Sequence, residues 1–538
     1  MAIDPVSIAG LSLAALDQLL KLGERTYELI QDSRAFDDDT RKLSRKIADE
    51  NIRTRLLRGL LFSETPIYGN KTLFEQFEPD IQKQIQLLLG PLKGILQEGC
   101  DLLERRYGVT EQNFGLASQT SNLSLASTLT PNSHVPSPRS KSPSIPDFFR
   151  WSFQDKKRVK AIVDEVGDQN NRVHEKIKLW CLASQLGVNV QHLQRLQRDE
   201  ISRQLGFDVD ATLRLTQWDA LNVQSGLELT DPSWNQYLKP ITPVPNQGKF
   251  ATLTKDGIAY VHEGHHYETE ARCPSNVLDG RTRKKVDDLA KLLHQPKEQV
   301  FRIPRCVGWK FMPMQKSIGF VFEMPSTPDA QPTSLLRLLS SSESKPELGD
   351  KFRLALNLAR CIAQLHMVKW VHESFRSENI LFFPSANSEV EFTEPWVMGF
   401  NFSRPESFFS AGPANFLPAE NIYRHPERQG EPEKMFSKIH DIYALGVVLL
   451  EIGLWEPAIK LEKNMFAHAR DGYAIQSQLI KHAQKRLESR VGRKYRDAVV
   501  KCLTGSFDVR DDNKEDLKLQ QAFRTQVVDV FEMAANFV

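Results

Sequence analysis

The second half of the chain is defined by a short polar stretch that reads His372-Glu373-Ser374-Phe375-Arg376-Ser377-Glu378-Asn379. An apolar run from Ile380 to Phe383 follows it directly. The hydroxyl of Ser374 does not accept a proton near neutral pH, so position 374 carries no general base. The stretch is therefore more informative about the fold than about chemistry.

This stretch resembles the catalytic loop of protein kinases, in which His-Arg-Asp is followed by four variable residues and an Asn. In kinases the Asp accepts the proton of the substrate hydroxyl, and the Asn holds a magnesium ion. Here His372 and Asn379 keep the frame, while Ser374 replaces the Asp. The resemblance implies a kinase-like fold without its catalytic base.

Further segments follow in the order in which kinases use them. They are Trp396 to Asn401 for the strand that ends in Asp-Phe-Gly, Tyr423 to Glu427 for the segment that ends in Ala-Pro-Glu, and Asp441 to Ile452 for the central helix of the large lobe. Phe400 is kept, but Gly399 replaces the magnesium-binding Asp. The resemblance implies that His372 and Phe400 are stacked core residues. It also implies that Glu427 anchors the activation segment and that Asp441 holds the loop backbone.

The small lobe that the resemblance implies has lost most of its nucleotide contacts. Glycines between residues 240 and 265 are too scattered for a Gly-x-Gly-x-x-Gly loop, and Arg272 stands where the strand lysine is expected. A vestigial nucleotide pocket would consist of Arg272, Leu381 and Asn379. We expect no cofactor and no metal, although apolar walls and hinge backbone groups could still receive ATP. Val286 to Leu293 has helical spacing and would form the regulatory helix, with Asp287 or Asp288 in place of its glutamate.

Composition limits the remaining classes of protein. The 538 residues carry a net charge of +2, which gives no case for nucleic acid binding. Six scattered cysteines without a Cys-x-x-Cys pair argue against zinc and against a disulfide framework. The start has no basic region typical of a signal peptide, and the apolar stretch from Val6 to Leu20 is interrupted by Asp17. We expect a soluble cytoplasmic protein that can be recruited to the plasma membrane.

The first 200 residues follow a helical pattern. Apolar residues recur at helical spacing over residues 5–113 and again from Trp151 to about Leu196, and a segment rich in Ser, Thr and Pro separates them at about 115–147. The predicted organisation has four parts. They are a helical bundle at 1–200 that contains this disordered insertion, a linker or brace at 201–240, a small lobe at 241–325 and a large lobe at 326–538. The predicted fold class is multidomain, an all-α bundle followed by an α+β bilobal kinase-like fold.

The N-terminal part also resembles a known family. Pro5 to Gly10, Tyr27 to Asp39 and Leu56 to Arg58 are similar to the HeLo domain of fungal incompatibility proteins, a prion-inhibition and propagation domain. That resemblance implies a helical bundle whose N-terminus inserts into membranes and causes programmed cell death. HeLo domains also occur beside degenerate kinase-like domains in fungi. Self-association through the bundle and an upstream receptor of the innate-immune type are the partners it implies.

A basic stretch in the bundle permits a membrane step. Its cations are Arg41, Lys42, Arg45, Lys46, Arg53, Arg55 and Arg58. Each cation near an anionic lipid surface contributes about 1 kcal/mol, whereas a solvated bundle face is the ordinary alternative. The predicted function is a pseudokinase that acts as a signalling or cell-death executioner or regulator of the heterokaryon-incompatibility type. An atypical active kinase and a non-enzymatic scaffold are the alternatives.

Overall fold

The structure, a computed structural model, describes most of the chain. The described residues are 5–32, 38–107, 153–219, 225–238, 249–266, 277–315, 317–325, 332–341, 345–383, 390–400, 404–405, 417–430, 434–462, 464, 466 and 469–537. They divide into two compact units. The first unit comprises Met1–Trp180 and Asp199–Leu205, and the second comprises Cys181–Arg198 and Gly206–Val538. The predicted insertion at 115–147 and Arg272 lie outside the described residues.

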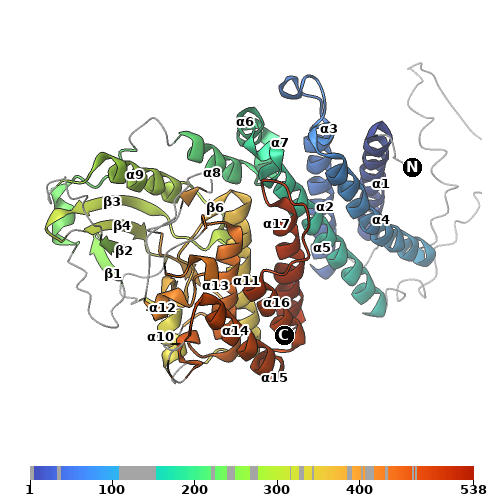
Figure 1. Cartoon of the computed structure of the whole chain (residues 1–538). Coiled ribbons are helices and arrows are strands. Elements are labelled where there is room, and N and C mark those ends of the chain that lie inside the picture. The colour runs from blue at the N-terminus through green and yellow to red at the C-terminus, as the bar shows by residue number, and fades with distance from the viewer. Residues whose placement is uncertain are drawn as a thin grey trace, which may run out of the picture. The chain divides into compact units, whose positions relative to one another are not determined.

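The first unit is helical, as the periodic pattern predicted (Figure 1). Its helices are α1 (Pro5–Asp32), α2 (Asp38–Phe62), α3 (Leu73–Gln76), α4 (Pro79–Tyr107), α5 (Phe153–Ala183, of which the last three residues belong to the second unit) and α7 (Glu200–Gln204), with a 3-10 turn at Pro66–Tyr68. Helix α1 packs on α2 and α4. Its apolar stripe is buried, with Leu16 and Leu19 almost fully covered, whereas Leu11 is about half exposed at 53%. Burial of this stripe is what holds α1 in the bundle.

A buried polar contact joins α2 to α5. The Nδ2 group of Asn170 donates to the Glu50 carboxylate at 2.7 Å and to the Glu50 carbonyl at 3.1 Å. Burial raises the pKa of Glu50, against the opposing effects of Arg53 and Asn170. Because a buried carboxylate is costly without partners, these hydrogen bonds fix which faces of the two helices meet.

The second unit begins with helical segments and continues into a four-stranded antiparallel sheet. The helices are α6 (Val190–Arg198) and α8 (Asp208–Asp219), and 3-10 turns lie at Gln185–Val188 and Pro232–Gln236. The strands β1 (Phe250–Lys255), β2 (Ile258–His266), β3 (Cys306–Met312) and β4 (Ser317–Glu323) are ordered β1-β2-β4-β3. Helix α9 (Gly280–His294) lies between β2 and β3 in sequence and packs beside the sheet (Figure 1).

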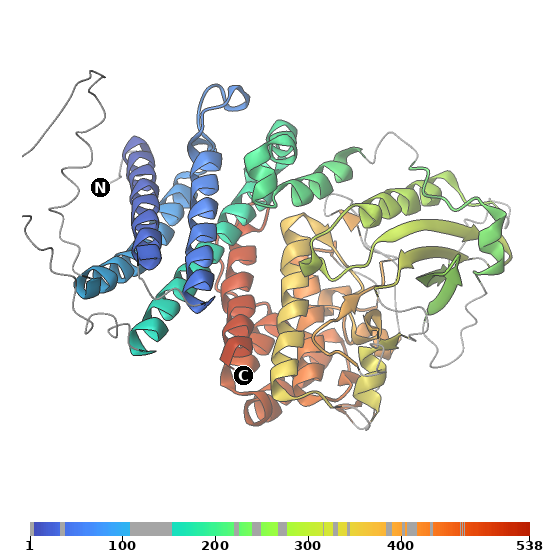
Figure 2. The same cartoon turned by 180° about the vertical axis from the view of Figure 1, so that it is seen from behind.

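Helices dominate the rest of this unit. They are α10 (Leu335–Ser340), α11 (Leu348–Met367), α12 (Pro418–Asn421), α13 (Lys438–Leu454), α14 (Gly472–His482), α15 (Glu488–Val491), α16 (Arg493–Thr504), α17 (Leu517–Phe523) and α18 (Asp529–Phe537), with π-helical turns at Ala483–Leu487 and Arg524–Val528. The short strands β5 (Thr333–Ser334), β7 (Ile380–Phe382) and β8 (Trp396–Val397) form one small sheet, and β6 (Trp370–Val371) pairs with β9 (Arg404–Pro405). Figure 2 shows from behind the four-stranded sheet at one end of the unit and these helices at the other. An α+β region therefore follows the helical region, as predicted.

Helix α13 lies at the centre of the second unit. All of its residues are buried except Ile439, because the segment is apolar on every side. Ser437 and His440 form a reciprocal capping box at its start, and Trp455 ends it in the left-handed conformation at φ 56°. Among the described residues, no helix of either unit is both long and apolar enough to cross a membrane.

Candidate functional site

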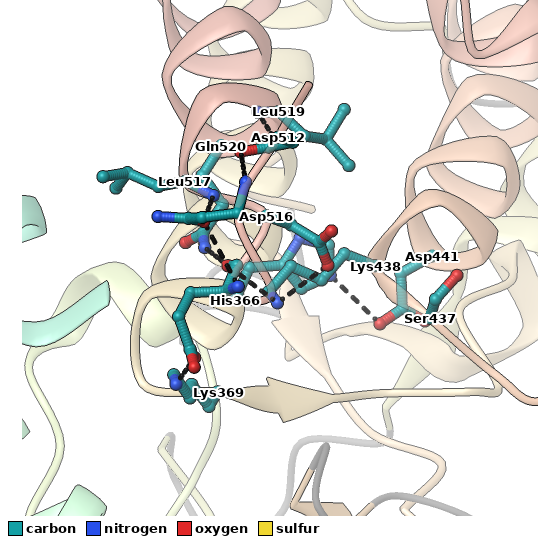
Figure 3. Close-up of polar contacts among 12 residues, drawn as sticks. His366, Lys369, Ser437, Lys438, Asp441, Asp512, Asp516, Leu517, Leu519 and Gln520 are labelled. Atoms are coloured by element: carbon teal, nitrogen blue, oxygen red, sulfur yellow. Dashed lines mark hydrogen bonds and ion pairs between the residues drawn. The ribbon is translucent and has the colours of Figure 1, made fainter. Parts of the chain in front are cut away.

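The loop 372–379 is held by the first turn of α13. The Asp441 carboxylate accepts the backbone N–H of His372 at 2.8 Å and that of Glu373 at 3.0 Å. The Nε2 atom of His366 lies 3.3 Å from the same carboxylate, and Figure 3 shows His366 and Asp441 together. Glu373 adopts φ +63°, a conformation that costs energy for a residue with a Cβ. The hydrogen bonds to Asp441 hold the loop in this turn.

Aromatic rings pack against one another at the start of the loop, in tilted rather than stacked arrangements. The rings of His372 and Phe400 lie 4.9 Å apart between centroids, and Trp370 approaches Phe400 at 5.8 Å. His372 and Phe400 are fully buried. Burial lowers the pKa of His372 to about 4, so the ring is neutral at physiological pH. A neutral, enclosed imidazole acts here as a packing residue.

Asn379 and Ser374 contact each other across the loop. The Nδ2 group of Asn379 donates to the Ser374 carbonyl at 2.7 Å and lies 3.1 Å from the Ser374 hydroxyl. Gly399 packs against the same amide at φ +94°, and a Cβ on Gly399 would lie 2.2 Å from Asn379 Nδ2. Only glycine fits this position without displacing Asn379.

The most unusual group near the loop is a fully buried carboxylate on β2. Glu263 accepts the backbone N–H of Gly399 at 3.0 Å and that of Phe400 at 3.1 Å. The His265 Nε2 atom lies 2.7 Å from Glu263 Oε1. Burial would raise the pKa of Glu263, but His265, Lys249 and the Gly399 N–H together lower it to about 2. We call Glu263, His265, His372, Asn379, Gly399 and Phe400 the buried polar centre.

Charged side chains surround this centre on the loop side. Arg376 contacts Glu378 at 3.1 Å and Glu420 at 3.0 Å. Burial, with Arg376 nearby, lowers the pKa of Lys249 and that of Arg424. Glu378, Glu420 and Glu263 offset the charges of Arg376, Arg424 and Lys249, so the cluster has no excess positive charge that would bind an anion.

A second buried carboxylate lies on α13. Glu451 Oε1 accepts the Tyr423 hydroxyl at 2.7 Å and the Ala458 N–H at 2.7 Å. The Ser377 hydroxyl lies 2.8 Å from that of Tyr423, which links the loop to α13. Burial raises the pKa of Glu451 to about 7. Glu451 therefore titrates near neutrality, whereas Glu263 stays ionised there.

Glu427 belongs to the single His, Cys, Asp and Glu group in the described residues with the spacing of a metal site. His425, Glu427 and His440 each offer a ligand atom within 4.8 Å of the others. However, the His440 Nδ1 atom accepts the Ser437 N–H at 3.0 Å, and the His425 Nδ1 atom accepts the Glu427 N–H at 3.4 Å. Each neutral ring must then carry its proton on Nε2, so neither offers a free lone pair. The residues fit an internal hydrogen-bonded cluster better than a metal site, and Lys434 also pairs with Glu427.

The start of α13 is fixed by a polar loop that precedes α17 (Figure 3). The Lys438 side chain is completely buried and contacts Asp516 at 3.2 Å, while Lys369 pairs with Glu515. Asp512 caps α17 by accepting the N–H groups of Lys518 at 2.9 Å and Leu519 at 2.8 Å. These contacts tie the loop before α17 to the element that positions Asp441.

Five of the seven basic residues of α2 contact acids, three of them on neighbouring helices. Arg58 contacts Asp17 at 2.5 Å, Arg55 contacts Glu24 at 2.9 Å and Lys46 contacts Asp164 at 2.6 Å. Within α2, Arg41 lies 3.6 Å from Asp38 and Arg53 lies 3.3 Å from Glu50. Lys42 and Arg45 are exposed.

Sequence reasoning brought together His372, Phe400, Asn379 and Gly399, and the structure also gathers these four. Leu381 is buried on β7. Sequence reasoning missed Glu263, His265 and Glu451. A signal was available for Glu263, since an acid inside the alternating strand Ile258–His266 needs a partner if it faces the core.

Comparison with known proteins finds one family model that matches part of the chain. Residues 270–536 match the model of a family described as Domain of unknown function (DUF7580). This match is just under half of the chain and runs from before α9 to α18. It includes the loop 372–379, Gly399 and Asp441, but not Glu263. No curated protein matches the chain.

Proposed function

We propose that residues 249–537 form a degenerate protein-kinase-like domain that does not transfer phosphate. Support comes from the position of Asp441, whose carboxylate accepts two N–H groups of the loop 372–379. Further support comes from the contact between the buried rings of His372 and Phe400. The sheet order β1-β2-β4-β3, with α9 between β2 and β3 in sequence, is compatible with the small lobe of a kinase.

The residues of the buried polar centre support the proposal that phosphate transfer has been lost. Phosphate transfer needs a base for the substrate hydroxyl and carboxylates for magnesium. At the two expected positions stand Ser374 and Gly399, and the Asn379 amide is occupied by Ser374. The Glu263 carboxylate accepts the N–H groups of Gly399 and Phe400 and so places a negative charge next to them. A nucleotide phosphate brought to these N–H groups would be repelled by a carboxylate that already accepts their hydrogen bonds.

Incubation of the full chain with labelled ATP, magnesium or manganese and a generic protein substrate tests this proposal. An active kinase serves as the positive control. We expect no transfer and no thermal shift with ATP. Metal-dependent transfer that Ser374→Ala abolishes would establish the atypical active kinase instead.

We further propose that the helical first unit is HeLo-like, and that the protein is a signalling or cell-death executioner or regulator that acts at membranes. The sequence resemblance of Pro5 to Gly10 and Tyr27 to Asp39 supports this proposal. The buried stripe of α1 could bind lipid only after leaving the bundle, since Leu16 is 2% exposed. Most cations of α2 would likewise have to exchange an internal acid for a lipid headgroup.

Leakage of anionic liposomes and viability of expressing cells test the membrane proposal. We expect the full chain and residues 1–205 to differ, with the shorter chain more active because the second unit restrains the first. A folded 1–205 fragment that neither permeabilises liposomes nor reduces viability would favour the scaffold alternative.

A further inference from the structure

The segment 225–238, here called the strap, adds itself to the exposed edge of β3. The Trp309 N–H donates to the Leu227 carbonyl at 3.0 Å, and the Leu229 N–H donates to the Trp309 carbonyl at 2.8 Å. Glu228 and Trp309 thereby form a parallel bridge. Gly308 permits this approach, because a Cβ there would lie 2.4 Å from the Leu227 carbonyl oxygen. The strap therefore closes an edge that would otherwise be open.

The strap also contacts α9 through two carboxylates, Asp287 on α9 and Glu228 on the strap. Asp287 accepts the Ser225 N–H at 2.9 Å and the Ser225 hydroxyl, and it accepts Trp309 Nε1–H at 3.2 Å. Glu228 pairs with Arg283 one turn earlier on α9. Burial opposes ionisation of Asp287, but the hydrogen bonds from Ser225 and Trp309 lower its pKa overall. The strap, α9 and β3 therefore meet at Asp287.

The far end of the strap is anchored on the outer face of the sheet. Trp234 and Leu238 pack with Leu253 of β1 and Val321 of β4 in a separate apolar cluster. The ring of Trp234 also contacts Tyr260 edge-on at 5.5 Å. The strap is thus fixed at both ends, by polar contacts to α9 and by apolar contacts to the sheet.

We propose that the strap is a conformational clamp that sets the position of α9, and that α9 is freed when the strap leaves the β3 edge. A single row of paired residues connects this clamp to the buried polar centre. Across the sheet, Glu228 neighbours Trp309, Trp309 neighbours Phe320, and Phe320 neighbours Glu263. The clamp follows from contacts within the second unit and does not depend on the proposed function.

Hydrogen exchange with mass spectrometry on the full chain tests the clamp. Ser225→Ala removes the hydroxyl on Asp287, and Gly308→Ala displaces the strap from β3 without changing α9. Because a hydrogen bond to a charged group typically contributes enough to change an opening equilibrium tenfold or more, we expect exchange in α9 to rise about tenfold in both variants. Exchange in α13 should not change.

Ser233→Ala is the matched control, because Ser233 donates to Asp231 within the same turn of the strap and away from α9. It should leave exchange in α9 as in the wild type. The clamp is refuted if α9 exchanges at the wild-type rate in Ser225→Ala. It is also refuted if all helices of the unit accelerate together, since that result indicates general destabilisation. If Gly308→Ala fails to fold, Ser225→Ala alone decides.

Discussion

Glu263→Gln is the substitution whose effect is most directly calculable from the structure. The pKa of Glu263 is about 2 in the folded chain, against an ordinary value of 4.5. At about 1.4 kcal/mol for each pKa unit, ionised Glu263 stabilises the fold by roughly 3 kcal/mol. Glutamine has nearly the same shape, but its NH₂ group would face one of the two N–H groups that the carboxylate accepts. We expect Glu263→Gln to lower the free energy of unfolding by about 3 kcal/mol at pH 7.

The pH dependence has a defined sign. Because the folded pKa of Glu263 is lowered, its contribution is present above pH 4.5 and is lost as the pH falls toward 2. The difference between wild type and variant should therefore shrink to less than about half when the pH is lowered to about 3. Urea unfolding followed by tryptophan fluorescence measures it, since Trp309, Trp370 and Trp455 all report on the second unit.

Glu323→Gln provides the control on the same sheet. Glu323 forms a surface pair with Arg305 at 3.2 Å, and both side chains are about half exposed. Such a pair contributes about 0 to 1 kcal/mol. If Glu263→Gln costs no more than Glu323→Gln at pH 7, the assignment of Glu263 as an ionised anchor of Gly399 and Phe400 is wrong.

Four further outcomes are expected. Gly399→Ala should destabilise the second unit by more than about 2 kcal/mol, because its Cβ would collide with Asn379. Gly257→Ala is the control, since Gly257 also has a positive φ but has open space around it. Equal unfolding midpoints for the two variants would contradict the contact with Asn379. Glu451→Gln should stabilise the fold at pH 8 by about 3 kcal/mol and leave its stability unchanged near pH 4. The reason is that the raised folded pKa of Glu451 makes the wild type lose stability as the pH rises from 4.5 through 7. Urea unfolding at pH 4 and pH 8 measures the difference, and a difference that does not depend on pH would contradict the prediction. Zinc titration by calorimetry should show no stoichiometric uptake at His425, Glu427 and His440, and uptake that His440→Gln removes would overturn the proton assignment. Leu16→Glu should lower the melting temperature of the first unit, whereas Leu11→Glu should not, because only Leu16 is buried; similar melting curves would mean that α1 is not held by this stripe.

Local signals in the sequence were enough to predict the helical first unit, whereas the α+β second unit was predicted from the resemblance of the stretch from His372 to Asn379 and its neighbouring segments to protein kinases. Apolar spacing marked α1, α2, α4, α5 and α9, and the resemblance to kinases placed a helix from Asp441 to Ile452, within α13. Glu263 could not be placed in this way, because its partners Gly399 and Phe400 lie 136 and 137 residues further along the chain. Spacing along a strand does not encode such distant pairing.

The basic stretch of α2 illustrates a second limit of the sequence. The number of cations in α2 suggested a basic helix face, but a count of residues cannot show which acids on other helices pair with them. In the structure, Asp17, Glu24 and Asp164 come from α1 and α5 and pair with three of these cations. Likewise, the spacing of His425, Glu427 and His440 gave no indication that both rings use Nδ1 as an acceptor.

The row of paired residues that ends at Glu263 also affects which register the strands of the sheet adopt during folding. Successive side chains of a strand point to opposite faces, so a slip of β2 by one residue would turn Glu263 away from Gly399 and Phe400. The carboxylate would then lack both N–H donors, and His262 or Gly264 would stand in its place. A misregistered sheet would therefore lose these hydrogen bonds to the buried carboxylate, in addition to its apolar contacts. Glu263 thus favours one register of β2 against β4, because in the neighbouring registers its buried charge would lack these two N–H donors.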